Sequence, residues 1–217
     1  MTINPKVIDI YHGDNVSADG FAKAHAFGIR GVIHKATQGA AMFDVTYPHR
    51  REAALAAGML WGAYHFNTSE SVAAQVKHFI NYAKPDKDTL CALDLEDNKD
   101  SNMSMAQAKQ FLETVDDTTG KLCALYSGNR IKELIAHADD ATRGFFGKRK
   151  LWLCQYASAP RLVDYNGTPL PWANCWLWQY TDGEVGPLPH GVPGIQPHMD
   201  VNHYAGTDEE LKAEWVA

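Results

Sequence analysis

Two acidic side chains at the end of an apolar run are the residues best placed to do chemistry. Asp94 and Glu96 close the run Leu-Cys-Ala-Leu-Asp-Leu-Glu, which begins at Leu90. In a β-strand alternate side chains leave the same face, so these carboxyl groups would project together from Cα atoms roughly 6.6 Å apart. Carboxyl groups this close push each other's pKa apart, which suits general acid and base work such as glycoside hydrolysis. Two solvated acids before a loop are the alternative, equally compatible with the pair alone.

Two further acids lie inside apolar segments, where an ionised carboxylate is costly. Asp9 lies within Val-Ile-Asp-Ile, and Asp200 lies between Met199 and Val201. Each should therefore have hydrogen-bonding partners or belong to a functional site. A structural role, with backbone donors or Lys35 as the partner, is the alternative for each. Four acids converging on one cleft are harder to explain as an accident of structure.

Apolar runs alternate with helical patterns through the first two thirds of the chain. The patterns predict strands over residues 7–11, 31–37, 61–66, 90–96, 121–127, 151–156, 175–180 and 199–202. They predict helices over residues 17–27, 47–57, 70–82, 105–115 and 130–137, with Ser17 and Ser104 as N-caps. The later intervals are rich in Pro, Gly and Asn, so we expect the late crossovers to be loops.

This alternation predicts an α/β fold with parallel strands and right-handed crossovers. About eight strands and five helices favour a shortened (β/α) TIM-like barrel. An open doubly wound sheet is the alternative, but Gly-x-Gly-x-x-Gly and Walker loops are absent from the sequence, which leaves nucleotide binding with little support.

Polar and aromatic side chains recur at the ends of the predicted strands. In a barrel these ends build the active site, and flat aromatic rings can stack on sugar rings. The candidate substrate-binding residues are Tyr11, Lys35, Gln38, Tyr64, Phe66, Tyr126, Tyr156, Trp178, Gln179 and Asn202. In Cys-Trp-Leu-Trp-Gln-Tyr, Trp176 and Trp178 would lie on one face of the strand, and Leu177 and Gln179 on the other. One of these two sets must be buried between the barrel and its exterior. We expect Trp176 in the core, and the environment of Trp178 stays open.

Composition excludes several classes of function. The chain has 217 residues, of which 45% are hydrophobic, and we expect a single catalytic domain over residues 1–217. A net charge of -6 argues against nucleic-acid binding. No apolar run approaches ~18 residues and the N-terminus lacks a signal-peptide pattern, so we expect cytoplasmic synthesis and no stable membrane insertion.

Other reactive side chains carry weaker signals. The four cysteines, Cys91, Cys123, Cys154 and Cys175, show no CxxC spacing and fit small buried thiols better than disulfides or zinc ligands. His34 and His65 lack a metal-binding pattern, so neither a metal nor another cofactor is expected. Ser127 is not part of a Gly-x-Ser-x-Gly elbow, which argues against a serine hydrolase.

Ordered short motifs cover nearly the whole chain. The first are Val-Ile-Asp-Ile at 7–10, His-Lys-Ala-Thr-Gln-Gly at 34–39, Gly-Ala-Tyr-His-Phe at 62–66 and Leu-Asp-Leu-Glu at 93–96. Tyr-Ser-Gly at 126–128, Leu-Trp-Leu-Cys-Gln-Tyr at 151–156, Trp-Leu-Trp-Gln-Tyr at 176–180 and Met-Asp-Val-Asn at 199–202 follow. Taken in this order, the motifs resemble the glycoside hydrolase family 25 lysozymes, the Chalaropsis-type muramidases.

The resemblance implies hydrolysis of the β-1,4 bond between N-acetylmuramic acid and N-acetylglucosamine in peptidoglycan. It implies that Glu96 is the general acid and that Asp94 either orients the substrate's acetamido group or stabilises the transition state directly. Asp9 and Asp200 match the family's other two acids. The family usually has Ser where this chain has Tyr11, and Glu where it has Gln38, so substrate placement or pH optimum is expected to differ.

The resemblance also carries expectations about origin and partners. It suggests a phage or prophage endolysin without a separate cell-wall-binding module, acting as a monomer on the wall after release or non-classical export. A chitinase-like hydrolase is one alternative, although the residues before Asp94 do not form the Asp-x-x-Asp-x-Asp-x-Glu motif of that group. A non-catalytic wall-binding barrel is the other.

Overall fold

The computed structural model describes residues 2–99 and 101–217. Eight strands form a closed barrel. β1 pairs with β9 on one side and with β2 on the other, and this second pairing closes the ring. They are β1 (Val7–Ile10), β2 (Gly31–Gln38), β4 (Leu60–Phe66), β5 (Leu90–Asp94), β6 (Ala124–Ser127), β7 (Leu151–Cys154), β8 (Leu177–Thr181) and β9 (Val201–His203). A two-residue strand, β3 (Met42–Phe43), extends β2 outside the ring. The predicted barrel is confirmed.

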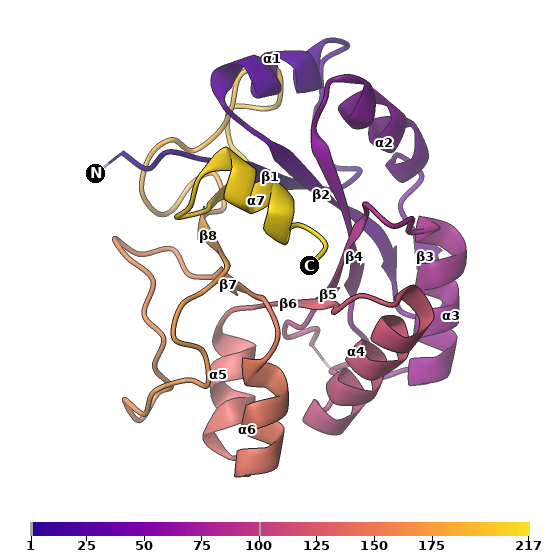
Figure 1. The fold of residues 1–217 in the computed structure, drawn as a ribbon, viewed down its shortest axis with the longest axis vertical. Helices are drawn as coiled ribbons and strands as arrows, with labels where there is room; N and C mark the ends of the chain where they lie inside the picture. Colours follow the sequence, from indigo (N-terminus) through magenta and orange to yellow (C-terminus); the bar gives the residue numbers. More distant parts are fainter. Residues whose placement is uncertain (1, 100) are drawn as a thin grey trace.

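Helices surround this barrel (Figure 1). The described residues form α1 (Gly20–Phe27), α2 (Tyr47–Ala56), α3 (Val72–Ala83), α4 (Met105–Thr119), α5 (Asn129–Ala136), α6 (Asp140–Gly147) and α7 (Asp208–Glu214). The first five match the predicted helices, whereas α6, α7 and β3 were not expected. Loops connect β7 to β8 and β8 to β9, as predicted for the late crossovers.

The last strand corrects the expectation of an all-parallel barrel. β9 is antiparallel to both β1 and β8, with Val7 opposite Asn202 and Ile8 opposite Val201. It also begins at Val201, so Asp200 precedes the strand instead of lying within it. Because β9 runs the other way, its beginning lies at the rim where the other strands end. Continuing the register with β1 brings Asp200 beside Asp9.

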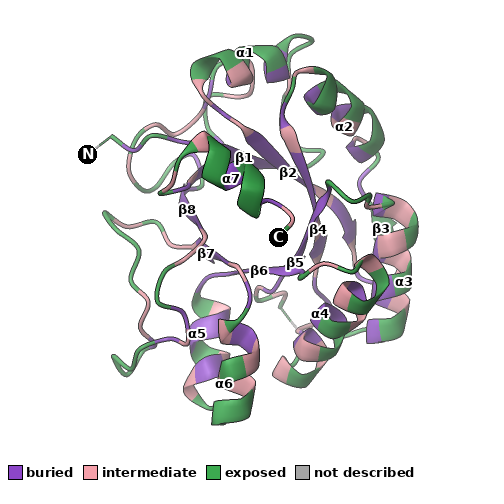
Figure 2. Cartoon of the chain, in the orientation of Figure 1, coloured by how far each residue is buried: buried purple, intermediate pink, exposed green. Residues whose placement is uncertain are grey.

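Side-chain alternation along the strands separates an inner from an outer core. The inner core contains Val7, Ile33, Leu90, Ala92 and Leu177, together with aromatic side chains of the barrel interior. The alternate residues pack outward against the helices, as Figure 2 shows by the buried strands and the exposed outer helix faces. This period of two, interrupted by irregularities after Lys35 in β2 and after Gln179 in β8, decides which polar side chains enter the barrel.

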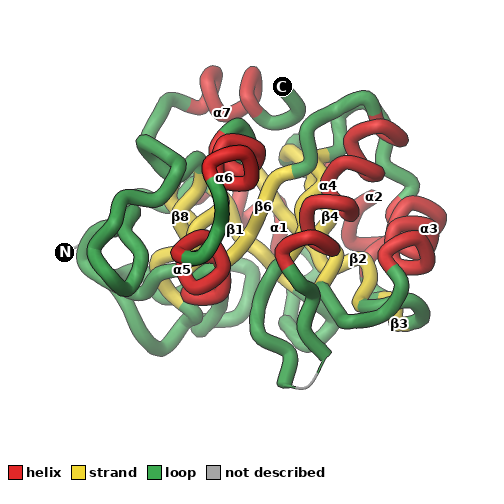
Figure 3. The backbone as a smooth tube through the Cα atoms, turned by 90° about the horizontal axis from the view of Figure 1, so that it is seen from below, coloured by secondary structure: helices red, strands yellow, loops and turns green. Residues whose placement is uncertain are grey.

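The C-terminal segment closes one end of the barrel. Trp215, just after α7, is 1% exposed, packs in the inner core beside Gly31, and donates from Nε1 to the carbonyl of Trp61 at 2.8 Å. A side chain at position 31 would overlap the indole, since an added Cβ would lie 2.6 Å from it. α7 lies at one end of the molecule and many connecting loops gather at the other (Figure 3). The end of the barrel away from α7 is therefore the open one, and most strands terminate at that end.

Two local expectations about helix caps have different outcomes. Ser104 caps α4 in a capping box, accepting from the backbone N of Gln107, as predicted. Ser17 does not cap α1, because the helix begins at Gly20 after Asp19, and the Ser17 hydroxyl donates to the carbonyl of Gly194 instead. Across the described residues, none of the helices has the length and apolarity that a membrane crossing requires.

Candidate active site

All four predicted catalytic acids line one cavity at the open end of the barrel. The cavity has a volume of about 210 Å³. Its lining residues are Asp9, Tyr11, Lys35, Tyr64, Phe66, Asp94, Glu96, Tyr126, Trp152, Gln179 and Asp200. The structure thus brings together side chains from all eight barrel strands or their ends, separated by up to 191 positions between Asp9 and Asp200. The alternative of solvated acids at a strand end is excluded by this geometry.

The backbone beyond β5 holds the Asp94 and Glu96 pair in place. Regular strand ends at Asp94, but the chain stays attached to β6, because the Leu95 amide donates to the Tyr126 carbonyl at 2.9 Å. The Ser127 hydroxyl donates to the Leu95 carbonyl at 2.6 Å. Buried Asn67 donates from Nδ2 to the Glu96 carbonyl at 2.9 Å. The alternation therefore continues past the strand, and both carboxyl groups face the cavity.

Asp9 is held by neutral amide donors. Gln179 Nε2 lies 3.0 and 3.1 Å from its two carboxyl oxygens, and Asn202 Nδ2 donates to Oδ2 at 2.7 Å. Each amide is oriented in turn by an aromatic donor. Trp152 Nε1 donates to Asn202 Oδ1 at 2.6 Å, and the Tyr126 hydroxyl donates to Gln179 Oε1 at 2.9 Å. This network fixes the carboxyl group without a neutralising cation.

Burial raises the pKa of both members of the central pair. Asp94 is 5% exposed, and desolvation followed by the nearby Glu96 charge raises its pKa well above the ordinary value, against an opposing effect of Lys35. Its Oδ1 has no hydrogen-bond partner among the described residues. The pKa of Glu96 is also raised, first by burial and then by Asp97. Asp97, which lies outside the predicted pair, is thus the largest electrostatic cause of the Glu96 shift.

The other two acids also favour the neutral form. Burial raises the pKa of Asp9 to about 7, although the hydrogen bonds from Asn202 and Gln179 oppose the shift. Burial, followed by the charge of Asp9, raises the pKa of Asp200 to about 9. A pocket with four such carboxyl groups can both donate and accept protons near neutral pH.

Lys35 supplies positive charge to this cavity, and Gln38 supports it from outside. The Lys35 ammonium donates to Gln38 Oε1 at 2.7 Å and lies 4.7 Å from the centre of the Phe66 ring. Burial lowers the Lys35 pKa, while Asp94 opposes this shift. Gln38 is not among the residues lining the cavity. In the structure Gln38 contacts Lys35, and its contact with substrate stays a prediction.

Trp178 and Asn202, two of the candidate substrate-binding residues, do not line the cavity. Trp178 packs in the outer core, and its Nε1 donates to the Gln155 carbonyl at 2.7 Å, because residues 177 and 179 take the inward positions of β8. Asn202 is fully buried behind Asp9. Trp176, expected in the core, packs against Trp215 at the closed end of the barrel.

Two residues of the site were missed by the sequence prediction. Trp152 lines the cavity and orients Asn202, and Asn67 holds the backbone of Glu96. The alternation in Leu-Trp-Leu-Cys places Trp152 on the inner face, so that signal was present in the sequence. Asn67 follows the end of β4 with no comparable signal, since its contact depends on the neighbouring loop.

Comparison with known proteins agrees with this architecture. The sequence profile described as Glycosyl hydrolases family 25 matches residues 8–187. The chain belongs to glycosyl hydrolases family 25. This membership places it among the glycoside hydrolases. A curated relative, the protein YegX of Escherichia coli O157:H7, is 28% identical over 185 residues. That match covers 82% of this chain and spans only 60% of the length of YegX.

Solved structures share this barrel fold. A muramidase from Acremonium alcalophilum is 25% identical with a TM-score of 0.76, and the match covers 96% of this chain and 97% of that one. A bacterial lysozyme from Streptomyces coelicolor is 21% identical with a TM-score of 0.79, covering 99% of this chain and 97% of that one. Because the Streptomyces lysozyme is only 21% identical to this chain, its similarity shows the shared fold alone.

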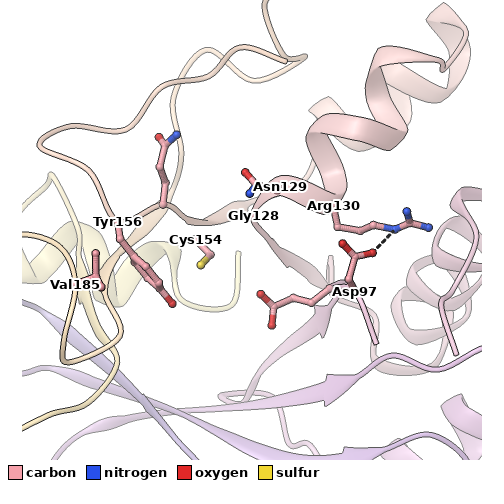
Figure 4. A pocket seen from close by; sticks show the side chains of 9 residues that line it. Asp97, Gly128, Asn129, Arg130, Cys154, Tyr156 and Val185 are labelled. Carbon is pink, nitrogen blue, oxygen red and sulfur yellow. Dashed lines mark ion pairs between the residues drawn. The ribbon is translucent and has the colours of Figure 1, made fainter. Parts of the chain in front are cut away.

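A groove adjoins the acidic cavity of this family 25 barrel. Its volume is about 530 Å³, and it shares Glu96 with the cavity. Figure 4 shows Tyr156 and Val185 on one side, Asp97 and Arg130 on the other, and Cys154 between them. Tyr156, predicted to bind substrate, therefore lines this groove instead of the central cavity. The groove extends the space available to a chain-like substrate beyond the acids.

The histidines and cysteines have structural surroundings. Among residues 2–99 and 101–217, no cluster of three or more His, Cys, Asp or Glu side chains could hold a metal ion. His65 lies 2.7 Å from the Thr37 hydroxyl and 3.1 Å from Gln75 Oε1, and burial lowers its pKa to about 4. All four cysteines are free; Cys91 and Cys123 are buried, as expected, whereas Cys154 and Cys175 are only half-buried.

Proposed function

We propose that this family 25 protein is a lysozyme of the N-acetylmuramidase type. Its reaction would be hydrolysis of the β-1,4 bond between N-acetylmuramic acid and N-acetylglucosamine in peptidoglycan. The observation that carries the proposal is the convergence of Asp9, Asp94, Glu96 and Asp200 on one cavity inside the barrel. Family membership and the 25% identical muramidase support the choice of substrate.

Glu96 is proposed as the general acid. Its raised pKa keeps a proton available for the oxygen of the leaving sugar. The groove beside Glu96 gives that leaving sugar room. Glu96 is the one acid shared by the cavity and the groove, which puts its carboxyl group at the boundary between the two halves of a bound glycan.

Asp94 is proposed as the partner of Glu96. Its Oδ1 has no protein donor among the described residues, so the carboxyl group keeps an acceptor free for an acetamido N–H of the substrate. Fixing that N–H would aim the acetamido oxygen at the anomeric carbon. Asp9, with a pKa of about 7, would add negative charge near the positive charge that develops there when it is ionised. Asp200, with a pKa of about 9, would hold the pair or the sugar by hydrogen bonds. A direct role of Asp94 in stabilising this charge is the other form of the same mechanism.

Substitution of the proposed acid tests this mechanism. Glu96→Gln should lower kcat on purified peptidoglycan by at least ~10²-fold with little change in the melting temperature, because general acid catalysis typically contributes that much. Glu113→Gln, which removes an exposed acid from α4, is the matched control. Asp9→Asn and Asp200→Asn should have smaller effects. Near wild-type turnover by Glu96→Gln would overturn the assignment.

The chemistry of the products tests the bond that is cleaved. Mass spectrometry of digested peptidoglycan should show N-acetylmuramic acid at the new reducing ends. Reducing-end N-acetylglucosamine would instead indicate a glucosaminidase, and anhydro ends would indicate a transglycosylase. Release of soluble products from chitin oligomers, without any from peptidoglycan, would favour the chitinase-like alternative.

We also propose that the protein acts on the wall after release or non-classical export, as a phage or prophage endolysin. Peptidoglycan lies outside the cytoplasmic membrane, so a protein made in the cytoplasm must cross that barrier. We further propose that it acts as a monomer. Cells expressing the protein should lyse only after their membrane is permeabilised. Lysis without permeabilisation would contradict the proposed route.

A further inference from the structure

The groove beside Glu96 continues into a third hollow. This hollow has a volume of about 380 Å³ and shares Asn129 and Gln155 with the groove. The groove in turn shares Glu96 with the catalytic cavity. The three spaces therefore form a continuous path along the barrel rim, leading from the acids past the start of α5.

Two cations line the far hollow without an acidic partner. Lys132 on α5 and Arg161 in the β7–β8 loop are close enough that Arg161 lowers the pKa of Lys132, after the larger effect of burial. Among the described residues, the side chains of both make no ion pair and no hydrogen bond. Asp164 also lines the hollow, but its Oδ1 accepts from the backbone amides of Asn166 and Thr168, each at 2.8 Å.

Burial makes this arrangement costly for the free protein. Lys132 is 6% exposed, and lysines are almost never this buried unless they are paired. The Lys132 ammonium lines the hollow and is not fully removed from water, so a ligand can reach it. Its partial burial costs solvation energy that a bound anion would return. The molecule as a whole carries a net charge of -6, so two adjacent unpaired cations on its rim contrast with the surrounding surface. Both features point to an anionic ligand group.

We propose that Lys132 and Arg161 form a subsite for a carboxylate carried by a muramyl residue on the leaving-group side of the cleaved bond. This inference rests on the proposed function. Muramyl and glucosaminyl residues alternate in peptidoglycan, so the sugar next to the cleaved bond lacks such a carboxylate and the following sugar carries one. The groove between Glu96 and the far hollow would hold the intervening sugar. The carboxylate belongs either to a peptide stem or to an unsubstituted lactyl group.

A binding experiment tests the subsite independently of catalysis. Acetyl-L-alanyl-D-glutamate with free carboxylates and its fully amidated counterpart are titrated into the protein and followed by NMR. The free acid should bind at least about fivefold more tightly, and Lys132→Met and Arg161→Gln should remove that preference. One charge-assisted hydrogen bond accounts for a change of this size. Lys77→Gln, which removes an exposed lysine from α3, is the charge-matched control.

Kinetics then distinguish the two sources of the carboxylate. Soluble glycan strands with peptide stems are compared with strands stripped of stems, which retain the lactyl carboxylate. If a stem is bound, Lys132→Met and Arg161→Gln should lower kcat/KM about tenfold more on the stem-bearing strands, mainly through KM. A loss on the stripped strands alone, with unchanged melting temperature, would assign the lactyl group, because the amide bond to the stem consumes that carboxylate in stem-bearing strands.

Two outcomes separate failure of this inference from failure of the proposed function. If both variants match Lys77→Gln on both strands and in the dipeptide titration, the subsite is wrong even though muramidase activity remains. If the wild type cleaves neither strand, the proposed function is wrong, and the dipeptide titration alone decides whether the cations bind carboxylates. Arg161 is exposed, so Arg161→Gln keeps the test valid if Lys132→Met fails to fold.

Discussion

At the scale of single residues, the site depends on neutral amides placed beside a buried acid. Gln179 and Asn202 both donate to Asp9, which opposes the effect of burial on its pKa. A lysine or arginine at either position would hold Asp9 permanently ionised and weaken the negative field of the cavity. Amide donors allow Asp9 to titrate near neutral pH while its geometry stays fixed.

Removal of one amide should therefore change the pH dependence of activity. Asn202→Ala loses the 2.7 Å hydrogen bond to Asp9, so the Asp9 pKa should rise further. If Asp9 must be ionised, the acidic limb of the kcat/KM profile should move upward by about one pH unit. Asn81→Ala on α3, an exposed position, is the control. An unchanged acidic limb, despite a folded protein, would show that Asp9 does not set it.

At the scale of elements, the antiparallel β9 and the segment after α7 complete the barrel although its later strands are connected by few helices. β9 closes the ring between β8 and β1 and delivers Asp200 to the open end. The α7 segment fills the other end, where Trp215 packs beside Gly31 and Trp176. A short chain thereby obtains a closed core without a full set of crossover helices.

Truncation at this closed end should destabilise the fold without touching the site. Trp215→Ala removes a fully buried indole and its hydrogen bond to Trp61, and should lower the free energy of unfolding by about 3–5 kcal/mol. Urea denaturation followed by circular dichroism measures the change. Activity of the fraction that remains folded should be close to wild type. A loss below ~1 kcal/mol would mean that the end of the barrel collapses to fill the space.

At the scale of the whole molecule, the acidic cavity makes stability depend on pH. Asp9 and Asp200 have folded-state pKa values of about 7 and about 9, raised from 3.8, so the folded protein binds more protons than the unfolded chain between these limits. Their stabilising contribution is complete below about pH 4 and is lost as the pH rises through 7 to 9. Carboxyl groups with lowered pKa, such as Asp44 and Asp208, act in the opposite direction and lose their contribution in acid.

Neutralisation of one cavity acid should therefore stabilise the protein, and more so at higher pH. Asp200→Asn should raise the melting temperature by about 2–4 °C at pH 8, which corresponds to ~1 kcal/mol for a domain of this size. The gain should shrink towards pH 5, where the wild-type carboxyl group is protonated at little cost. Asp117→Asn on α4, which is exposed, should show neither effect. Scanning calorimetry across this pH range would contradict the interpretation if the gain did not change with pH.

The sequence by itself determined the strand and helix pattern and the identity of the acids. The period of two in Leu-Asp-Leu-Glu put Asp94 and Glu96 on one face, and an acid within Val-Ile-Asp-Ile required partners or a function. Helices such as α3 and α4 were predictable from apolar periodicity and caps. α7 also carried a readable signal, because Thr207 and Glu210 form a capping box. These features are local, so neighbouring residues suffice to specify them.

The tertiary structure alone decided which distant residues meet. The direction of β9 placed Asp200 at the open end, and closure of the ring turned Trp178 outward while it set Trp152 against Asn202, which holds Asp9. The Asn67 side chain likewise contacts the Glu96 backbone from a separate loop. Lys132 on α5 and Arg161 in the β7–β8 loop come to line the same hollow. No local pattern encodes such contacts, because each depends on how the whole sheet closes and which surface is thereby removed from water.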